Sequence, residues 1–187
     1  MQTAPNDDDI PPFLSGDGEM ARRIREFDWA CNPLGPPRNW SPSLKVIVRM
    51  ALSTRHPVFV FWGPQRICLY NDGFRPSLGP EKHPTMLGIP GEQAWSEIWP
   101  IIGPQIEQVL RGDGASWHEN QLVPILRHGS LQDAYWTYSY GPIDDPAAPN
   151  NIGGLLVLCT ETTRQVQAEQ KLADDVRRLA TLFEEAP

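Results

Sequence analysis

One stretch, His56 to Asp72, constrains the fold more than any other. Its sequence, HPVFVFWGPQRICLYND, holds two short runs of β-branched and aromatic residues, Val58–Trp62 and Ile67–Tyr70, on either side of Gly63-Pro64-Gln65. Two such runs around a Gly-Pro turn predict a β-hairpin. Both runs are nearly continuous rather than alternating, which indicates strands covered on at least part of both faces. We therefore expect this hairpin to lie at the centre of a sheet.

The segment before the hairpin divides into a tail and a helical cap. Residues 1–14 are polar and rich in proline, and we expect a disordered tail. Residues 15–54 carry two helical patterns. The first has Met20, Ile24 and Phe27 spaced by four and three, and the second begins at Ser41-Pro42, a serine N-cap followed by proline at the first position. We expect these two helices to cover part of the sheet.

The segment after the hairpin, within a predicted core of residues 55–163, supplies one longer helix and three more strands. The helix runs from Pro100 to Arg111 and ends at Gly112-Asp113-Gly114. The predicted strands are 117–127, in which Pro124 marks an edge or a bulge, then 134–140 and 152–160, with a loop over 141–151. The order predicts an α+β fold, a five-stranded antiparallel sheet with helices on one face.

Residues 164–187 predict an amphipathic exit helix that leads to a following domain. Its apolar positions are spaced four, three and four, as in the seam of a coiled coil: Leu172, Val176, Leu179 and Phe183. Such a seam is stable only when another surface covers it. Two arrangements remain open, pairing with the same helix of a second chain or folding back on the sheet.

Composition excludes several classes of partner. The 187 residues carry a formal net charge of −7, which argues against a nucleic-acid surface and against an anionic membrane. The first residues lack the basic and apolar regions of a secretory signal, and no apolar run approaches the roughly 20 residues that span a bilayer. The three cysteines form no CxxC pair, which fits buried, reduced thiols. We expect a cytoplasmic protein.

No constellation of residues points to catalysis or to a metal. The four histidines, His56, His83, His118 and His128, are scattered without ligand spacing. His118-Glu119 with Pro124 superficially resembles a phosphoacceptor box, but the proline falls one position late and the residues alternate like a strand. Gly112-x-Gly114 lacks the lysine of a phosphate loop. We expect that this chain is not an enzyme and has no metal site.

Aromatic residues, seven of them tryptophans, give the most interesting set of candidate site residues. They either line a ligand pocket between sheet and helices or fill that space as core, and the sequence leaves both open. A pocket needs a few convergent polar groups in an apolar wall. The candidates for a pocket are Tyr70, Asn71, Trp95, Trp99, Trp117, His118, Trp136 and Tyr138, with Asn120 and Ser139 as further polar candidates.

Several motifs resemble the PAS domain, a sensor module, and in particular the N-terminal PAS module of bacterial multi-PAS sensor histidine kinases. They run from about residue 18 to 163 and are DW at 28–29, LGPP at 34–37, WG at 62–63, LYND at 69–72, the segment 78–88 with KHP at its centre, the segment 95–99, TYSYGPI at 137–143 and the segment 153–163 with ETT at its end. The closing LFEEAP at 182–187 resembles the start of a second PAS unit.

The resemblance implies a sheet-and-helix pocket, homodimerisation through flanking helices, and output through the exit helix to downstream PAS and kinase domains of the same chain. That output would control a histidine kinase in two-component phosphorelay signalling. No cofactor is predicted. The flavin-binding N-C-R-F-L-Q motif is absent, no cysteine lies between Asp72 and Arg111, and the helix 100–111 has no haem-ligating histidine. Two other functions stay open, a receptor for an unknown small ligand and a structural dimerisation spacer.

Overall fold

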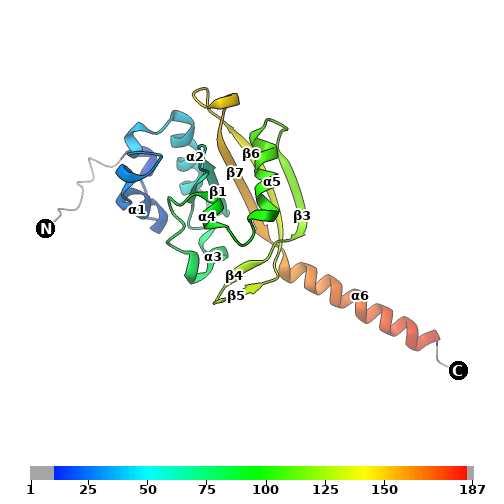
Figure 1. Cartoon of the computed structure of the whole chain (residues 1–187). Helices are drawn as coiled ribbons and strands as arrows, with labels where there is room; N and C mark the ends of the chain where they lie inside the picture. Colours follow the sequence, from blue (N-terminus) through cyan, green and yellow to red (C-terminus); the bar gives the residue numbers. More distant parts are fainter. Residues whose placement is uncertain (1–10, 185–187) are drawn as a thin grey trace.

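The computed structural model describes residues 11–184 of the chain. Its centre is a five-stranded antiparallel sheet with strand order β2-β1-β7-β6-β3 (Figure 1). The strands are β1 (Val58–Trp62), β2 (Ile67–Tyr70), β3 (Ser116–Leu122), β6 (Tyr135–Asp144) and β7 (Ile152–Glu161). The predicted α+β class and five-stranded antiparallel sheet are confirmed.

The predicted hairpin forms with its predicted bounds and is buried on both faces. Phe59 pairs with Tyr70 and Trp62 with Ile67, and every residue of β1 and β2 is buried. The predicted position of the hairpin at the centre of the sheet is wrong, because β2 is an edge strand and β1 is the second strand, which also pairs with the middle strand β7. The free edge of β2 is covered by a loop, because the Cys68 N–H donates to the Ile89 carbonyl and the Gly88 N–H donates to the Cys68 carbonyl, each at 2.9 Å. This covering removes an exposed strand edge.

The N-terminal cap consists of α1 (Glu19–Glu26) and α2 (Pro42–Ser53), which lie beside the β1–β2 end of the sheet (Figure 1). The predicted N-cap is confirmed, since the Ser41 hydroxyl accepts a hydrogen bond from the Leu44 N–H at 3.2 Å. Helix α2 contacts β1, and its residues Leu44 and Val48 belong to the buried core. The cap thus completes the burial of β1.

The predicted tail over residues 1–14 is wrong at its C-terminal end, while residues 1–10 lie outside the described part of the chain. Pro12–Leu14 form a 3-10 turn that contacts both α1 and α2, and the Leu14 side chain is only 1% exposed. The Phe13 ring packs 5.9 Å from that of Trp40. Two large apolar side chains outweigh the polar, proline-rich context because the cap offers a surface to bury them.

The other helices lie over one face of the sheet, as predicted. They are α3 (Arg75–Lys82), the single turn α4 (Gly91–Ala94) and α5 (Trp99–Leu110). Helix α3 is interrupted at Gly79, whose φ of 68° and following Pro80 break the regular helix. Helix α5 crosses β6 and β7 (Figure 1), and Ile102, Ile106 and Val109 form its buried stripe.

Pro124 ends a strand rather than bulging it, so the predicted strand over 117–127 is wrong as a single element. Residues after Pro124 form β4 (Ile125–Arg127), which pairs with β5 (Ser130–Gln132) in a separate two-stranded sheet packed on α3. His128 and Gly129 turn this hairpin with φ of 51° and 73°, as two-residue hairpin loops require. Proline lacks the N–H that a continuing ladder needs.

The predicted loop over 141–151 begins too early. Strand β6 continues to Asp144, with Gly141 paired to Leu156 and Ile143 paired to Gly154. The glycine and proline in this segment predicted a turn. Instead, pairing with the long strand β7 continues through both residues.

The last element, α6 (Thr163–Glu184), begins directly after β7 and extends away from the rest of the chain (Figure 1). Its predicted seam residues Leu172, Val176, Leu179 and Phe183 are 55% to 81% exposed. The alternative in which the helix folds back on the sheet is therefore not what the structure has. Within residues 11–184, no helix has the length and apolarity needed to cross a membrane.

A charged cluster joins the cap to α3 and makes a pH-dependent contribution to stability. Glu19 of α1 accepts a hydrogen bond from Arg23 at 2.6 Å, lies 3.0 Å from His83 Nε2, and pairs with Arg75 at 2.6 Å. These contacts, with Arg23 first, lower the pKa of Glu19 from 4.5 to about 2. The charged carboxylate is favoured in the folded state, so its contribution is complete above about pH 4.5 and is lost as the pH falls toward 2.

We expect the urea midpoint of the unmodified chain to fall more steeply between those two pH values than that of the Glu19→Gln variant. The measurement is urea unfolding, followed by tryptophan fluorescence, at a series of pH values. Glu26→Gln is the control, because Glu26 pairs only with Arg22 on the exposed side of the same helix. Parallel curves for the unmodified chain and Glu19→Gln would show that the cluster does not contribute.

Candidate functional site

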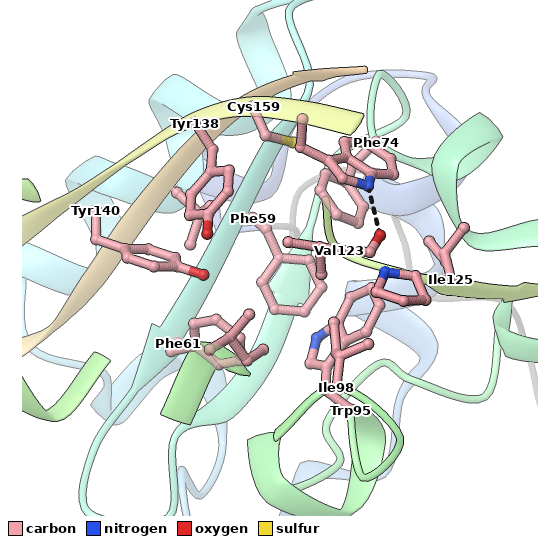
Figure 2. A pocket seen from close by; sticks show the side chains of 14 residues that line it. Phe59, Phe61, Phe74, Trp95, Ile98, Val123, Ile125, Tyr138, Tyr140 and Cys159 are labelled. Atoms are coloured by element: carbon pink, nitrogen blue, oxygen red, sulfur yellow. Dashed lines mark hydrogen bonds between the residues drawn. The ribbon is translucent and has the colours of Figure 1, made fainter. Parts of the chain in front are cut away.

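A cavity lies between the sheet and the helices that cover it (Figure 2). Its volume is about 70 Å³, and fourteen residues line it. Side chains alternate along a strand, and the register places Phe59 beside Val157 and Tyr138 beside Cys159 on the same face. These four residues form part of the sheet wall, which is completed by Phe61, Trp136 and Tyr140.

The opposite wall comes from the segment around α4 and α5 and from the break between β3 and β4. Trp95 follows α4, Ile98 precedes α5 and Ile102 lies within α5. The proline break contributes Val123, Pro124 and Ile125, and Phe74 completes the lining. The interruption of the strand at Pro124 therefore has a consequence for the site, since it turns three residues inward over the cavity.

The cavity is electrically neutral. None of its lining side chains is a carboxylate, a lysine, an arginine or a histidine. Burial raises the pKa of the Cys159 thiol to about 12 and raises the pKa of the Tyr140 hydroxyl well above its ordinary value. Both groups are therefore protonated at neutral pH. The Tyr138 hydroxyl donates to Gln105 Oε1 at 2.9 Å and lies 3.0 Å from Gln121 Oε1.

Two tryptophans in the lining differ in their hydrogen bonding. The Trp136 indole N–H donates to the Val123 carbonyl at 3.1 Å. The Trp95 indole nitrogen is fully buried and has no hydrogen-bond partner among the described residues. The Trp95 ring is held from outside the cavity by Lys82, whose ammonium lies 4.7 Å from the ring centroid and 2.7 Å from Glu97. The indole plane is thus fixed, with its N–H unused.

Three of the eight predicted pocket residues, Trp95, Trp136 and Tyr138, line this cavity. Trp117 does not, because it lies on the opposite face of β3, paired with Ser139, and is 66% exposed. His118 does not line it either, since its ring stacks on that of Tyr138 at a centroid distance of 4.7 Å. Trp99 packs against Phe61, with ring centroids 6.5 Å apart, and is not part of the lining.

Tyr70 and Asn71 lie outside the lining of the cavity, and their polar groups bond to other parts of the fold. The Tyr70 hydroxyl lies 3.0 Å from His83 Nδ1. The Asn71 amide is buried and bonds only to backbone groups. Of the further polar candidates, Asn120 has its backbone N–H bonded to Thr137 Oγ1, and Ser139 donates to the Ser116 carbonyl. None of these four residues lines the cavity.

Five of the lining residues that were not predicted from the sequence lie on the strands of the main sheet, where side chains alternate between the two faces. Tyr140 shares a face with Trp136 and Tyr138, and Phe61 shares one with Phe59. Counting every second residue from Trp136 would have found Tyr140. Nothing local in the sequence indicated that Val123 and Ile125 turn inward.

The cavity wall is connected to the exit helix by a short chain of contacts. The Arg127 guanidinium lies 5.5 Å from the Trp136 ring centroid and bonds Glu161 at 2.9 Å. Glu161 in turn accepts from the Thr163 hydroxyl at 2.8 Å, and Thr163 is the first residue of α6. Arg127 also donates to the Ser77 carbonyl of α3 at 3.2 Å. These contacts link the Trp136 ring to the first residue of α6.

The part of the chain that the structure describes contains no metal-binding arrangement. Among residues 11–184, no three side chains of His, Cys, Asp or Glu are grouped so that they could hold a metal ion.

Comparison with known proteins identifies the fold. No protein-family model and no curated protein matches the sequence. Solved structures do match it. The RsLOV d2 variant has a TM-score of 0.50 and 13% identity over 65% of this chain and 68% of that chain. The PAS domain of a Colwellia psychrerythraea protein has a TM-score of 0.47 and 14% identity over 65% of this chain and 98% of that domain. The chain has a PAS fold.

An RNA-binding Light-Oxygen-Voltage receptor also matches, with a TM-score of 0.49 and 14% identity over 82% of this chain. The chain spans only 43% of that receptor. The structural similarity to the RsLOV d2 variant, at 13% identity, shows a shared fold and nothing about activity or ligand. The cavity described above lies within the PAS fold, and α6 leaves the PAS sheet at the end of its central strand β7.

Proposed function

We propose that this chain is a cytoplasmic sensory and dimerisation PAS module that regulates a downstream histidine kinase in two-component signal transduction. The proposal joins the PAS fold to the sequence motifs that resemble N-terminal PAS modules of such kinases. The chain itself regulates and does not catalyse. Two copies pair through their flanking helices, and the paired α6 helices carry a change in the PAS sheet to the next domain.

The observation that carries this proposal is the exposed apolar seam of α6. Four seam residues at coiled-coil spacing remain exposed on a helix that extends away from the sheet (Figure 1). Apolar side chains at such positions are stabilised when a second helix covers them. A seam spaced four, three and four favours an identical helix, so a second copy of this chain is the partner that fits it best.

The contacts at the base of α6 supply a route for regulation. Arg127 touches the cavity wall at Trp136 and pairs with Glu161 beside the first turn of α6. Its side chain is 15% exposed, so this ion pair is shielded from solvent more than an ordinary surface pair. A shift of the cavity wall would change the position of Arg127 and, through Glu161, the position of α6.

Replacing Arg127 with Gln should change the rate of kinase autophosphorylation in the full-length protein by at least about twofold, since residues that couple two sites typically contribute 0.5 to 2 kcal/mol. The measurement is transfer of labelled phosphate from ATP. Arg111→Gln is the matched control, because Arg111 makes only a long, exposed pair with Asp113. Equal rates in the two variants and the unmodified protein, with the fold intact by circular dichroism, would count against the coupling.

A receptor for a small ligand is the second candidate function, and the cavity favours it. A cavity lined by apolar and aromatic side chains is the kind of site that binds small molecules, whereas a structural spacer does not need one. In the receptor function, occupancy of the cavity is the signal that α6 transmits. This function and the relay function share the same exit helix.

A further inference from the structure

The N-terminal cap has an excess of positive charge in a chain whose formal net charge is −7. Residues 15–55 contain seven lysine and arginine side chains and only four aspartate and glutamate side chains. Among residues 11–184, no carboxylate forms an ion pair with Arg25 of α1 or with Lys45 and Arg49 of α2. The charge of these three side chains is therefore not neutralised within the described part of the chain.

The two arginines are held in place by the backbone of one short segment. Arg25 Nη1 donates to the Leu14 carbonyl at 2.7 Å and to the Gly16 carbonyl at 3.0 Å. Arg49 Nη1 donates to the Ser15 carbonyl, which lies between those two in sequence, at 2.8 Å. Two guanidinium groups from different helices thus flank the same three residues.

The Lys45 ammonium extends this positive surface along α2. Lys45 lies one helical turn before Arg49, and its Nζ donates to the Arg38 carbonyl at 2.8 Å. The same Nζ lies 5.9 Å from the centroid of the Phe13 ring. All three cations therefore gather around residues 13–16, and we call Lys45 and the two arginines the cap cluster.

Backbone carbonyls orient the cap cluster without neutralising it, because a carbonyl oxygen carries no net charge. Arginine and lysine each have several N–H donors, and the bonds to carbonyls occupy one nitrogen of each side chain. The remaining guanidinium donors match the two oxygens of a carboxylate, which accepts two parallel hydrogen bonds from one arginine. Three cations around one segment suit several neighbouring carboxylates better than a single one.

The charge of the whole chain decides between the kinds of anionic partner. Its net charge of −7 repels extended polyanions such as nucleic acid or an anionic membrane surface. A short acidic segment of a protein needs only local positive charge within about 10 Å, the screening length at moderate salt. The cap lies at the opposite end of the molecule from α6 (Figure 1), so pairing through α6 leaves the cap cluster accessible.

We propose that the cap cluster binds an acidic segment of a partner protein, whose aspartate or glutamate carboxylates accept hydrogen bonds from Arg25 and Arg49. Lys45 supplies a third positive charge beside them. This interaction surface is separate from the cavity and from the seam of α6, and it goes beyond the function proposed above.

The probe for this surface is the acetylated and amidated peptide Gly-Asp-Glu-Asp-Glu-Gly, and its neutral counterpart has Asn and Gln in place of Asp and Glu. Each peptide is titrated into the full chain in a calorimeter. We expect the acidic peptide to bind and the neutral peptide not to bind. Raising the salt from about 50 mM to about 500 mM should weaken the acidic peptide at least about 5-fold, because salt screens exposed charges.

Replacing Arg49 with Gln should weaken the acidic peptide by about 3- to 10-fold, between the values for an exposed ion pair and for a hydrogen bond to a charged group. Arg25→Gln should have an effect of the same size. Arg22→Gln is the matched control, because Arg22 lies on α1, pairs with Glu26 at 2.9 Å and carries the same charge. It should leave the affinity within about 2-fold. Near-UV circular dichroism shows whether each variant keeps its tertiary structure, and Arg49→Lys, which keeps the charge, should bind more tightly than Arg49→Gln.

Four results would overturn the proposal. The first is no binding of the acidic peptide, and the second is equal weakening by Arg49→Gln and Arg22→Gln, which would mean general charge attraction without a site. The third is displacement of the peptide by an equal concentration of inorganic phosphate, which would mean a small-anion site. The fourth is binding only after Asp7, Asp8 and Asp9 are changed to Asn, which would assign the cluster to the chain's own acidic run.

None of these results bears on pairing through α6, which is measured by subunit mass. Failure of the cap cluster as an interaction surface and failure of the proposed signalling function are therefore distinguishable.

Discussion

Replacing Asn71 with Asp should destabilise the chain more than any other isosteric substitution, by about 3 kcal/mol or more. The Asn71 side chain is 1% exposed and organises the junction between the cap, β1 and α3. Its oxygen accepts from the backbone N–H groups of Val58 at 3.0 Å and Phe74 at 3.1 Å. Its nitrogen donates to three carbonyls, those of Ala51, Thr54 and His56, at 2.8 to 3.1 Å.

An aspartate keeps the shape and the two accepted bonds but places a carboxylate oxygen against those three carbonyl oxygens. The carbonyls lose their donor, and the negative charge is buried beside their partial charges. The measurement is the free energy of unfolding from urea titration near neutral pH. Asn39→Asp, at an exposed position of the same cap, introduces the same charge and should change stability by less than about 0.5 kcal/mol. Equal stability of the two variants would refute this role of Asn71.

Replacing Leu179 with Asp should weaken self-association by at least about 100-fold. Each buried leucine contributes about 1.5 to 3 kcal/mol, and a symmetric pair loses two of them while gaining two like charges. Leu179 lies in the middle of the exposed seam, between Val176 and Phe183, so no flanking contact of the seam replaces it.

The matched control is Thr181→Asp, which adds the same charge to an exposed position of α6 outside the seam. Subunit mass should remain that of a dimer in the control and become that of a monomer in Leu179→Asp over the same concentration range. If both variants remain dimeric, the chains are joined by a contact other than the seam.

Local patterns in the sequence predict those parts of the fold that depend on neighbouring residues. The hairpin Val58–Trp62 and Ile67–Tyr70 has its predicted bounds because a Gly-Pro turn separates two apolar runs. The Ser41 N-cap forms because serine followed by proline specifies a helix start on its own. These signals do not depend on what the rest of the chain does.

The predictions from the sequence were wrong where the local structure depends on contacts between residues that are far apart in the chain. Leu14 is buried because the cap folds around it, although the polar, proline-rich residues before it predicted a disordered tail. Ile125 leaves the main sheet because Pro124 stops the ladder and α3 offers a surface for a second hairpin. A proline in a strand pattern is compatible with an edge, a bulge or an end, and the sequence alone does not choose among them.

The candidate site illustrates the same limit. Residue type alone placed Trp95, Trp117 and Trp136 in one set, yet Trp117 lies on the far face of the sheet. Its neighbour in sequence, His118, faces Tyr138, so a shift of one position decides which side of the sheet a residue occupies. The unpaired N–H of Trp95 is a property of three-dimensional packing, and no pattern in the sequence predicts it.

Native mass spectrometry of the unmodified 187-residue chain over a range of concentrations shows whether two chains pair through the seam of α6. We expect twice the mass of the 21.0 kDa chain, with the dimer persisting as the protein is diluted into the micromolar range. The mass of a single chain at every concentration would contradict it, because the exposed leucine, valine and phenylalanine side chains of α6 would then have no partner.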